Sequence, residues 1–237
     1  MIDKVILKEE AEKLGVMLDN TALDRFDIYA ERLVETNKTL NLTAITDPEG
    51  ILYKHFVDSL SLLNCVDVQT GAKAIDVGTG AGFPGVVLLI ARPDLKITLL
   101  DGTNKRLVFI DSLLRELGLD ADIVHQRAEL AGKDAKFREK FDLVTARAVA
   151  NLNTLGEYCL PFVKVGGVFA PMKAAKTDEE IAMSEGAIKL LGGRIKETKH
   201  FNIEKCGERY IIITEKISQT PSKYPRASAQ IAKKPLR

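Results

Sequence analysis

The chain has 237 residues, of which 46% are hydrophobic and 28% are charged, and its formal net charge is +1. These values are ordinary for a water-soluble chain with one α/β domain and an extension. No apolar run approaches the roughly 20 residues of a membrane span, the first residues lack the basic-then-apolar pattern of a signal peptide, and three scattered cysteines form neither a disulfide framework nor a metal spacing. We therefore expect a cytoplasmic protein with no membrane partner and no metal.

Residues 1–64 predict a helical layer that packs beside the α/β domain. Apolar side chains over residues 21–39 follow the three-four spacing of a buried helix face, with Asn20 or Thr21 as its cap. Asp47-Pro48 is typical of another helix start. His55 and Asp58 then fall within about one helical turn, on adjacent faces.

The segment 73–85 predicts a strand, a tight turn and a helix. A short apolar run ends at Asp76 and is followed by Gly78, Gly80, Gly82 and Gly85. Glycines permit positive φ and bring the backbone close to a ligand, and the following helix presents free N–H groups. Such a unit is typical of a nucleotide-like cofactor site, with Asp76 placed to orient the loop or to meet a cationic group.

The rest of the chain alternates strands with helices, which indicates a mostly parallel sheet. The expected strands are 73–77, 96–100, 122–125, 141–146 and 165–171, and the expected helices are 84–91, 104–117, 152–163 and 177–191. Two further strands, 194–202 and 209–215, are joined too tightly for a crossover and must be antiparallel. We predict an N-terminal helical layer (1–64), a cofactor-binding domain with a seven-stranded sheet ending in an antiparallel hairpin (65–217) and a basic C-terminal tail (218–237).

The glycine segment alone leaves two cofactors open. Gly80, Gly82 and Gly85 spell G-x-G-x-x-G, and Asp101 at the end of the next strand suits a ribose in either a nicotinamide enzyme or an S-adenosylmethionine (SAM) enzyme. A parallel sheet closed by an antiparallel hairpin suits the Rossmann-like fold of SAM-dependent methyltransferases better. SAM is therefore the expected cofactor, and a nicotinamide cofactor is the alternative.

The loops at the carboxyl ends of the strands, 78–83, 101–103, 126–129 and 145–149, should face one crevice. We expect Gly78 and Gly80 beside the methionine part of SAM, Asp101 at the ribose, Ala128 and Glu129 at the adenine, and Arg147 near the point of methyl delivery. Three alternatives stay open. Asp101 caps the 104–117 helix, Glu129 caps a short helix, or Phe83 is plain core.

The sequence offers no general base or nucleophile motif. Its three histidines are far apart, no G-x-S-x-G turn is present, and Ala146-Arg-Ala-Val stands where amine methyltransferases carry Asn/Asp-Pro-Pro-aromatic. This pattern favours an acceptor that has no proton to lose, such as N7 of guanine. Catalysis would then be alignment of reactants, with Arg147 as a positioning residue.

Charge is distributed unevenly along the chain. Residues 1–70 hold seven basic and thirteen acidic side chains, whereas residues 220–237 hold five basic side chains and no acid. The asymmetry suggests a surface for a polyanion, and a solvated basic tail explains it equally well. The tail is interrupted by prolines, so we expect a flexible or draped segment.

Several motifs along nearly the whole chain resemble the bacterial small-subunit (16S) rRNA guanine-N7 methyltransferases, also called glucose-inhibited division protein B. The motifs are Asn41-Leu-Thr43, His55-Phe-Val-Asp58-Ser-Leu60, Asp76 to Gly85, Leu99-Leu-Asp101 with Lys105-Arg106, Arg127-Ala-Glu129, Thr145-Ala-Arg147-Ala148, Tyr224-Pro-Arg226 and Lys234-Pro-Leu236. The resemblance implies SAM contacts at Gly78, Phe83, Ala128, Glu129 and Arg147. It also implies methylation of a guanine in the 530 loop, with 16S rRNA or the 30S subunit as the partner. We expect a monomer, although no feature of the sequence reveals the oligomeric state. Gly102-Thr103 follows Asp101 where the family more often has Ser.

The resemblance gives the basic tail a role in RNA binding, with contacts at Tyr224, Arg226, Lys233 and Lys234. Asn41, Thr43 and His55 are further candidates for RNA contact, with a hydrogen-bonded seam between the layers as the alternative. The side chain that stacks on the guanine stays open among Phe83, Tyr210 and Tyr224. Two other functions also stay open: a SAM methyltransferase of a small molecule, and a non-catalytic assembly factor that binds SAM and rRNA.

Overall fold

The computed structural model describes residues 2–147, 150–174 and 178–237. Its sheet is formed by β1 (Lys73–Val77), β2 (Lys96–Asp101), β3 (Asp122–His125), β4 (Phe141–Arg147), β5 (Val163–Lys173), β6 (Gly193–Ile203) and β7 (Gly207–Lys216). The strand order is β3-β2-β1-β4-β5-β7-β6. The first five strands in this order pair in parallel, and β7 is antiparallel to both β5 and β6. The predicted mostly parallel sheet with a terminal hairpin is confirmed.

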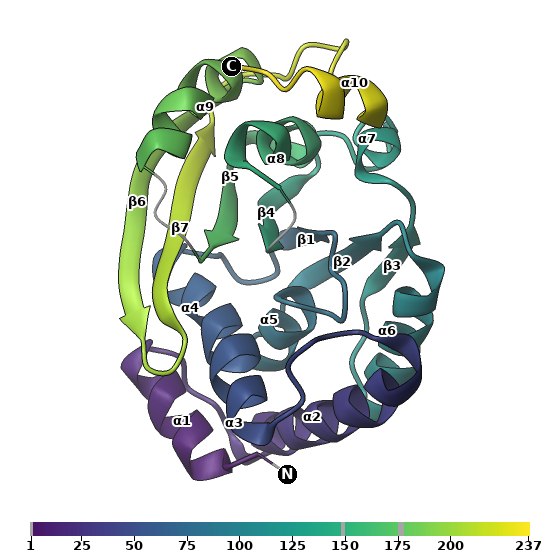
Figure 1. Cartoon of the computed structure of the whole chain (residues 1–237), viewed down its shortest axis with the longest axis vertical. Coiled ribbons are helices and arrows are strands. Elements are labelled where there is room, and N and C mark those ends of the chain that lie inside the picture. Colours follow the sequence, from purple (N-terminus) through teal and green to yellow (C-terminus); the bar gives the residue numbers. More distant parts are fainter. Residues whose placement is uncertain (1, 148–149, 175–177) are drawn as a thin grey trace.

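Helices cover the sheet on both faces (Figure 1). They are α1 (Lys4–Lys13), α2 (Asn20–Leu40), α3 (Pro48–Gly50), α4 (Asp58–Cys65), α5 (Gly85–Ala91), α6 (Asn104–Leu117), α7 (Ala128–Ala131), α8 (Leu152–Cys159), α9 (Asp178–Leu190) and α10 (Ser228–Lys233). A π-helical turn, Ile51–Val57, joins α3 to α4, and a 3₁₀ turn, Leu160–Phe162, follows α8.

Alternate residues of the strands feed two apolar clusters. Ile211 and Ile213 of β7 pack into the cluster that contains the N-terminal helices with α5 and α6, whereas Ile212 packs into the cluster beneath α8 and α9. This alternation is the period-two geometry of a strand whose two faces are both buried. The N-terminal layer therefore shares one continuous core with one face of the sheet.

Local details differ from the sequence prediction at the start of α2 and at the end of α8. Asp19, and not Asn20 or Thr21, caps α2, because its Oδ1 accepts a hydrogen bond of 2.7 Å from the Ala22 N–H. The helix expected over 152–163 ends at Cys159, where Pro161 prevents its continuation. The helix expected over 177–191 is α9, and residue 177 lies outside the described residues, as do residues 148–149 of the expected crevice loop.

The C-terminal tail is packed against the protein, so a flexible tail was the wrong alternative. Tyr224 and Ile231 are buried, and the Arg138 guanidinium donates hydrogen bonds to the carbonyls of Thr220 (2.6 Å) and Tyr224 (2.9 Å). Arg226 donates three hydrogen bonds to Glu157, which is fully buried in α8. Figure 1 shows the tail running beside α7 and α8. The tail is thus a draped segment fixed by an ion pair.

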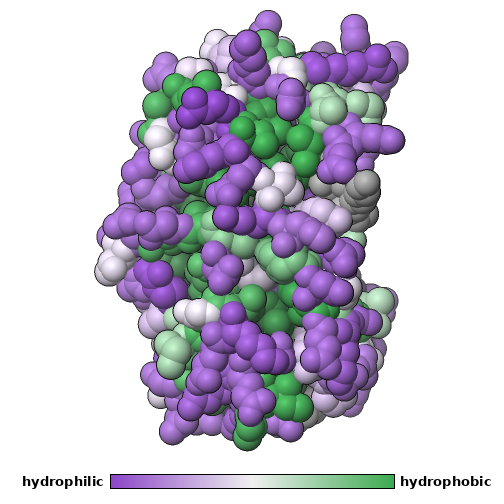
Figure 2. Space-filling model, turned by 90° about the vertical axis from the view of Figure 1, so that its left-hand side faces the viewer, coloured by the Kyte–Doolittle hydropathy of each residue, from purple (hydrophilic) through white to green (hydrophobic). Residues whose placement is uncertain are grey.

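Hydrophilic side chains dominate the face that carries the β6–β7 hairpin, and smaller apolar patches lie between them (Figure 2). The helices of the described residues include none with the length and apolar character needed to cross a membrane.

The Arg226–Glu157 pair generates a stability prediction. Arg226→Ala leaves the Glu157 carboxylate buried without its charged partner, which costs about 3 kcal/mol of unfolding free energy. Urea unfolding followed by circular dichroism measures the loss. Lys233→Ala, which removes an exposed charge of the same tail, should change stability by less than about 0.5 kcal/mol. Equal stability of both variants would show that the tail is not held by this pair.

Candidate functional site

The glycine loop after β1 is hydrogen-bonded to the end of the neighbouring strand β2. Gly78, Gly80 and Gly82 have φ of 75°, 62° and 104°, in the left-handed region that favours glycine. The N–H of Gly78 donates to the Leu100 carbonyl at 2.8 Å, and the N–H of Gly80 donates to Asp101 Oδ2 at 3.0 Å. The loop is therefore fixed to the end of β2, with its backbone open toward the edge of the sheet.

Asp76 lies beneath this loop and is almost fully buried. Its Oδ2 accepts hydrogen bonds from the Thr79 hydroxyl (2.7 Å) and the Gly85 N–H (2.9 Å). Its Oδ1 has no hydrogen-bond partner among the residues that the structure describes. Burial raises the pKa of Asp76 to about 6, despite these two hydrogen bonds. A buried carboxylate oxygen without a donor is unfavourable, so this position suits a ligand that brings a donor or a positive charge.

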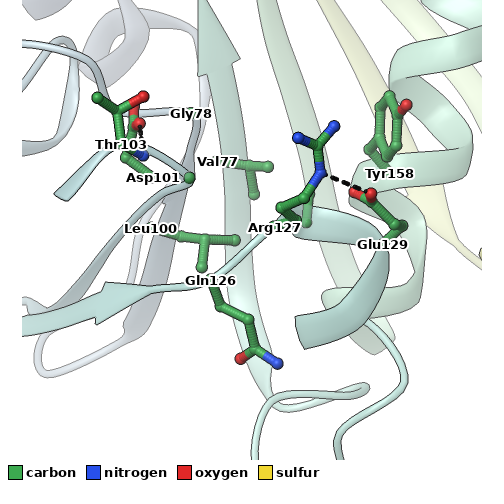
Figure 3. Close-up of a pocket in the computed structure, with 11 residues that line it drawn as sticks. Val77, Gly78, Leu100, Asp101, Thr103, Gln126, Arg127, Glu129 and Tyr158 are labelled. Atoms are coloured by element: carbon green, nitrogen blue, oxygen red, sulfur yellow. Dashed lines mark hydrogen bonds and ion pairs between the residues drawn. The ribbon is translucent and has the colours of Figure 1, made fainter. Parts of the chain in front are cut away.

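A first pocket of about 370 Å³ lies at the carboxyl ends of β1, β2 and β3 (Figure 3). It is lined by Val77, Gly78, Leu100, Asp101, Gly102, Thr103, Gln126, Arg127, Ala128, Glu129 and Tyr158. Glu129 is buried in the first turn of α7, and its Oε1 accepts a hydrogen bond of 2.8 Å from Arg127 Nε. The pocket thus combines apolar walls with two buried carboxylates, from Asp101 and Glu129.

The Asp101 carboxylate also organises the loop around it. Its Oδ1 accepts a hydrogen bond of 2.7 Å from the Thr103 N–H, and Arg106 Nη1 lies 3.6 Å from its Oδ2. The capping alternative is wrong, because Asp101 accepts from the N–H of Thr103, the residue before α6, and no side chain of the described residues caps the first turn of that helix. A carboxylate has about four lone-pair sites, so these contacts leave it able to accept hydrogen bonds from a ligand.

A second pocket of about 480 Å³ adjoins the first and shares Gly78, Asp101 and Gly102 with it. Its other lining residues are Leu42, Thr43, His55, Thr79, Gly80, Ala81, Phe83, Arg106 and Arg147. We call it the Arg147 pocket. The N-terminal layer forms one wall of this pocket and the sheet forms the other, so the layer is part of the site.

Arg147, the last residue of β4, is held by the N-terminal layer. Its Nη1 donates to Asp58 Oδ2 (3.0 Å) and to the Lys54 carbonyl (3.1 Å), and its Nη2 lies 3.3 Å from His55 Nδ1. The other oxygen of Asp58 accepts a hydrogen bond of 2.8 Å from Arg209 Nε of β7. Asp58 therefore bridges two guanidinium groups that come from different strands.

Aromatic rings complete this wall of the pocket. Phe83 stacks with His55 at 4.3 Å between ring centroids and with Tyr29 at 5.2 Å, and the Arg147 guanidinium lies 4.9 Å from the Phe83 centroid. The Tyr29 hydroxyl donates to the Ala81 carbonyl at 2.6 Å. Burial, followed by the positive charge of Arg147, lowers the pKa of His55 to about 3, so this imidazole is neutral at physiological pH.

Most of the predicted site residues line the two pockets, and the others lie outside them. Gly78, Gly80, Phe83, Asp101, Ala128, Glu129, Arg147, Thr43 and His55 line the two pockets. Asn41 is exposed and ends α2 in a left-handed conformation. Lys233 and Lys234 are exposed at the end of α10 and line neither pocket.

Two predicted RNA-contact residues of the tail have partners within the protein. Tyr224 is buried, and the Arg226 side chain is bonded to Glu157. The Arg226 guanidinium is therefore engaged with a buried carboxylate of the protein itself. Neither Tyr224, which is buried, nor Phe83, which is stacked between protein groups, is free to stack on a base, and Tyr210 already stacks on His200 at 4.6 Å.

Three residues that the prediction gave no role belong to the site: Asp58, Arg209 and Tyr158. Asp58 belongs to a motif that resembles the family, and this motif was the available signal. Arg209 is 151 residues from Asp58 in the sequence, so no local pattern links them. In the described part of the chain, no group of His, Cys, Asp and Glu side chains has the arrangement of a metal site.

Comparison with solved structures concerns the fold. TrmN from Thermus thermophilus aligns with a TM-score of 0.53 and 16% identity, over 70% of this chain and 53% of that chain. A SAM-dependent O-methyltransferase from Thermotoga maritima aligns with a TM-score of 0.52 and 18% identity, over 80% of this chain and 72% of that one. At these identities the similarity establishes a Rossmann-like methyltransferase fold.

Comparison of sequences identifies the family. Two relatives are named ribosomal RNA small subunit methyltransferase G. The one from Alkaliphilus metalliredigens is 45% identical over 100% of both chains. The one from Acetivibrio thermocellus is 47% identical over 98% of this chain and 96% of its own. A model of the GidB family, described as rRNA small subunit methyltransferase G, matches residues 22–211. The chain therefore belongs to the GidB family of SAM-dependent rRNA small subunit methyltransferases.

Proposed function

We propose that this protein methylates N7 of a guanine in the 530 loop of 16S rRNA. The observation that carries the proposal is the chemistry of the Arg147 pocket. Its histidine is neutral and bonded on both ring nitrogens, and its carboxylate, Asp101, already accepts two backbone N–H groups. Neither is suited to take a proton from an acceptor. Guanine N7 has a lone pair in the plane of the ring and no proton, so this pocket suits it.

The methyl donor of the family is SAM, and the residues present fit it. The unpartnered Oδ1 of Asp76 suits a cationic amino-acid end, and the glycine loop leaves room for a ligand against its backbone. Asp101 and Glu129 supply acceptors for ribose hydroxyls and an adenine amino group beside the small side chain of Ala128. When bound, SAM supplies an electrophilic methyl group on a sulfonium sulfur. Residues of the Arg147 pocket then orient the acceptor, which is catalysis by alignment.

The RNA surface is proposed to surround the Arg147 pocket. Arg106 lines this pocket, and the exposed residues Lys54 and Lys105 directly precede the lining residues His55 and Arg106 in the chain, whereas Arg226 is bonded to Glu157. Lys233 and Lys234 remain exposed and available to phosphates at the tail. Such contacts position RNA without reading its sequence. A guanine within a folded loop would have to be flipped out to reach the pocket.

A labelled-methyl assay tests the proposed function. The purified protein with SAM should transfer one methyl group to 16S rRNA, presented either as deproteinised RNA or as 30S particles from a strain that lacks the gene. Mass spectrometry of nuclease fragments should place N7-methylguanine in the 530 loop. Transfer to a small molecule alone, or SAM and rRNA binding without transfer, would replace the proposal by one of the two alternatives.

Arg147 is predicted to position the acceptor. Arg147→Lys keeps the positive charge but loses the planar group that contacts Asp58, the Lys54 carbonyl and Phe83. We expect the rate of methyl transfer to fall by roughly 100-fold, with a smaller loss of SAM affinity by calorimetry. Arg115→Lys, at an exposed ion pair of α6, is the matched control and should leave both unchanged. Equal losses of rate and SAM affinity would show that Arg147 binds the cofactor and does not position the acceptor.

The pH dependence of methyl transfer should be flat between about pH 7 and 9. His55 is neutral throughout this range, because its pKa is lowered from the usual 6.5 to about 3, and N7 releases no proton. The measurement is the single-turnover rate at saturating SAM. A rate that rises with pH through an inflection near 7, and loses that inflection in His55→Asn, would identify His55 as a general base.

A further inference from the structure

The Thr43 hydroxyl lies in the Arg147 pocket at a fixed position. Thr43 belongs to the segment between α2 and α3, and its N–H donates a hydrogen bond of 2.8 Å to Asn37 Oδ1. Its Oγ1 accepts a hydrogen bond of 3.0 Å from the Ile45 N–H. The backbone around Thr43 is thus held to α2, and the side chain is held to the turn that follows.

The direction of the bond between Thr43 and His55 follows from Arg147. The Thr43 Oγ1 and His55 Nε2 atoms are 2.9 Å apart, and His55 Nδ1 faces Arg147 Nη2 at 3.3 Å. A guanidinium has donors only, so Nδ1 must be the acceptor and a neutral imidazole carries its proton on Nε2. The Nε2–H group therefore donates to Thr43 Oγ1.

The Thr43 hydroxyl consequently keeps one proton to donate. A hydroxyl oxygen has two lone pairs and one proton. The Ile45 N–H and the His55 Nε2–H occupy both lone pairs, and the structure records no acceptor for the remaining proton within residues 2–147, 150–174 and 178–237. The chain of hydrogen bonds from Asp58 through Arg147 and His55 thus ends at an O–H group without an acceptor among these residues, on a residue that lines the Arg147 pocket.

A fixed donor distinguishes the two purines at the edge that carries N7. Guanine presents the O6 acceptor beside N7, whereas adenine presents an amino donor at that position. We propose that the Thr43 hydroxyl donates a hydrogen bond to O6 of the target guanine, which aligns N7 for methyl transfer and rejects adenine. This inference rests on the proposed guanine-N7 activity. It gives Thr43 a specificity role toward the substrate, and it gives Asp58, Arg147 and His55 a positioning role behind it.

The test pairs a substitution in the protein with a substitution in the RNA. The substrate is the form of 16S rRNA that is methylated in the assay above, with 2-aminopurine in place of the target guanine. This base keeps N7 and the 2-amino group but lacks O6. Thr43→Val removes the hydroxyl at nearly constant volume, and Thr43→Ser is the control that retains it. The readout is the ratio of single-turnover rates on guanine and on 2-aminopurine.

The wild-type protein and Thr43→Ser should both methylate guanine faster than 2-aminopurine. In each of them the ratio of the two rates should be roughly tenfold larger than in Thr43→Val. Any difference in the intrinsic reactivity of the two bases cancels in this comparison, as does a general loss of activity in the valine variant. An unchanged ratio in Thr43→Val would overturn the inference and leave the guanine-N7 activity standing. Failure of the wild-type protein to form N7-methylguanine on the native RNA would instead overturn the proposed function.

Discussion

The ion pair between Asp58 and Arg147 is the interaction on which the arrangement of the site depends. An ion pair that is so little exposed stabilises the folded protein only when the remaining hydrogen-bonding groups of both side chains are satisfied. Here one Asp58 oxygen pairs with Arg147 and the other pairs with Arg209, so three segments meet at one carboxylate: α4, β4 and β7. The orientation of Arg147 in turn sets which nitrogen of His55 carries the proton. One buried carboxylate thus determines the direction of hydrogen bonds up to the surface of the pocket.

The fold and the cofactor side of the site could be predicted because their signals are local. Each strand is a short apolar run, and the glycines that follow β1 mark a turn whose backbone conformation other residues rarely adopt. Asp101, Ala128 and Arg147 were predicted to converge because parallel strands bring their carboxyl ends to one edge. Convergence required no knowledge of side-chain contacts, only of strand direction. The pockets contain these residues as expected.

The remaining features depend on contacts between residues that are distant in the sequence. The pairing of Asp58 with Arg209 and of Glu157 with Arg226 joins side chains that no periodic pattern relates. The tail illustrates the problem, since its charge and prolines left a flexible and a draped segment equally open. Its packing instead follows from one buried glutamate in α8, whose need for a partner is invisible in the sequence of the tail. For the same reason the sequence left the role of Phe83 open between core packing and base stacking, because its contacts with His55 and Tyr29 come from distant segments.

The packed tail has a consequence for the order in which the molecule is completed. Arg127, which lines the first pocket, donates a hydrogen bond of 3.1 Å to the Ser228 hydroxyl. A Cβ added to Gly132, next to α7, would lie 3.1 Å from Pro225 Cγ. The tail thus packs on Arg127 and beside α7, at the outer side of the first pocket. Because a chain is made from its N-terminus, every residue that lines the first pocket is synthesised before the segment that packs against the outer side of this pocket.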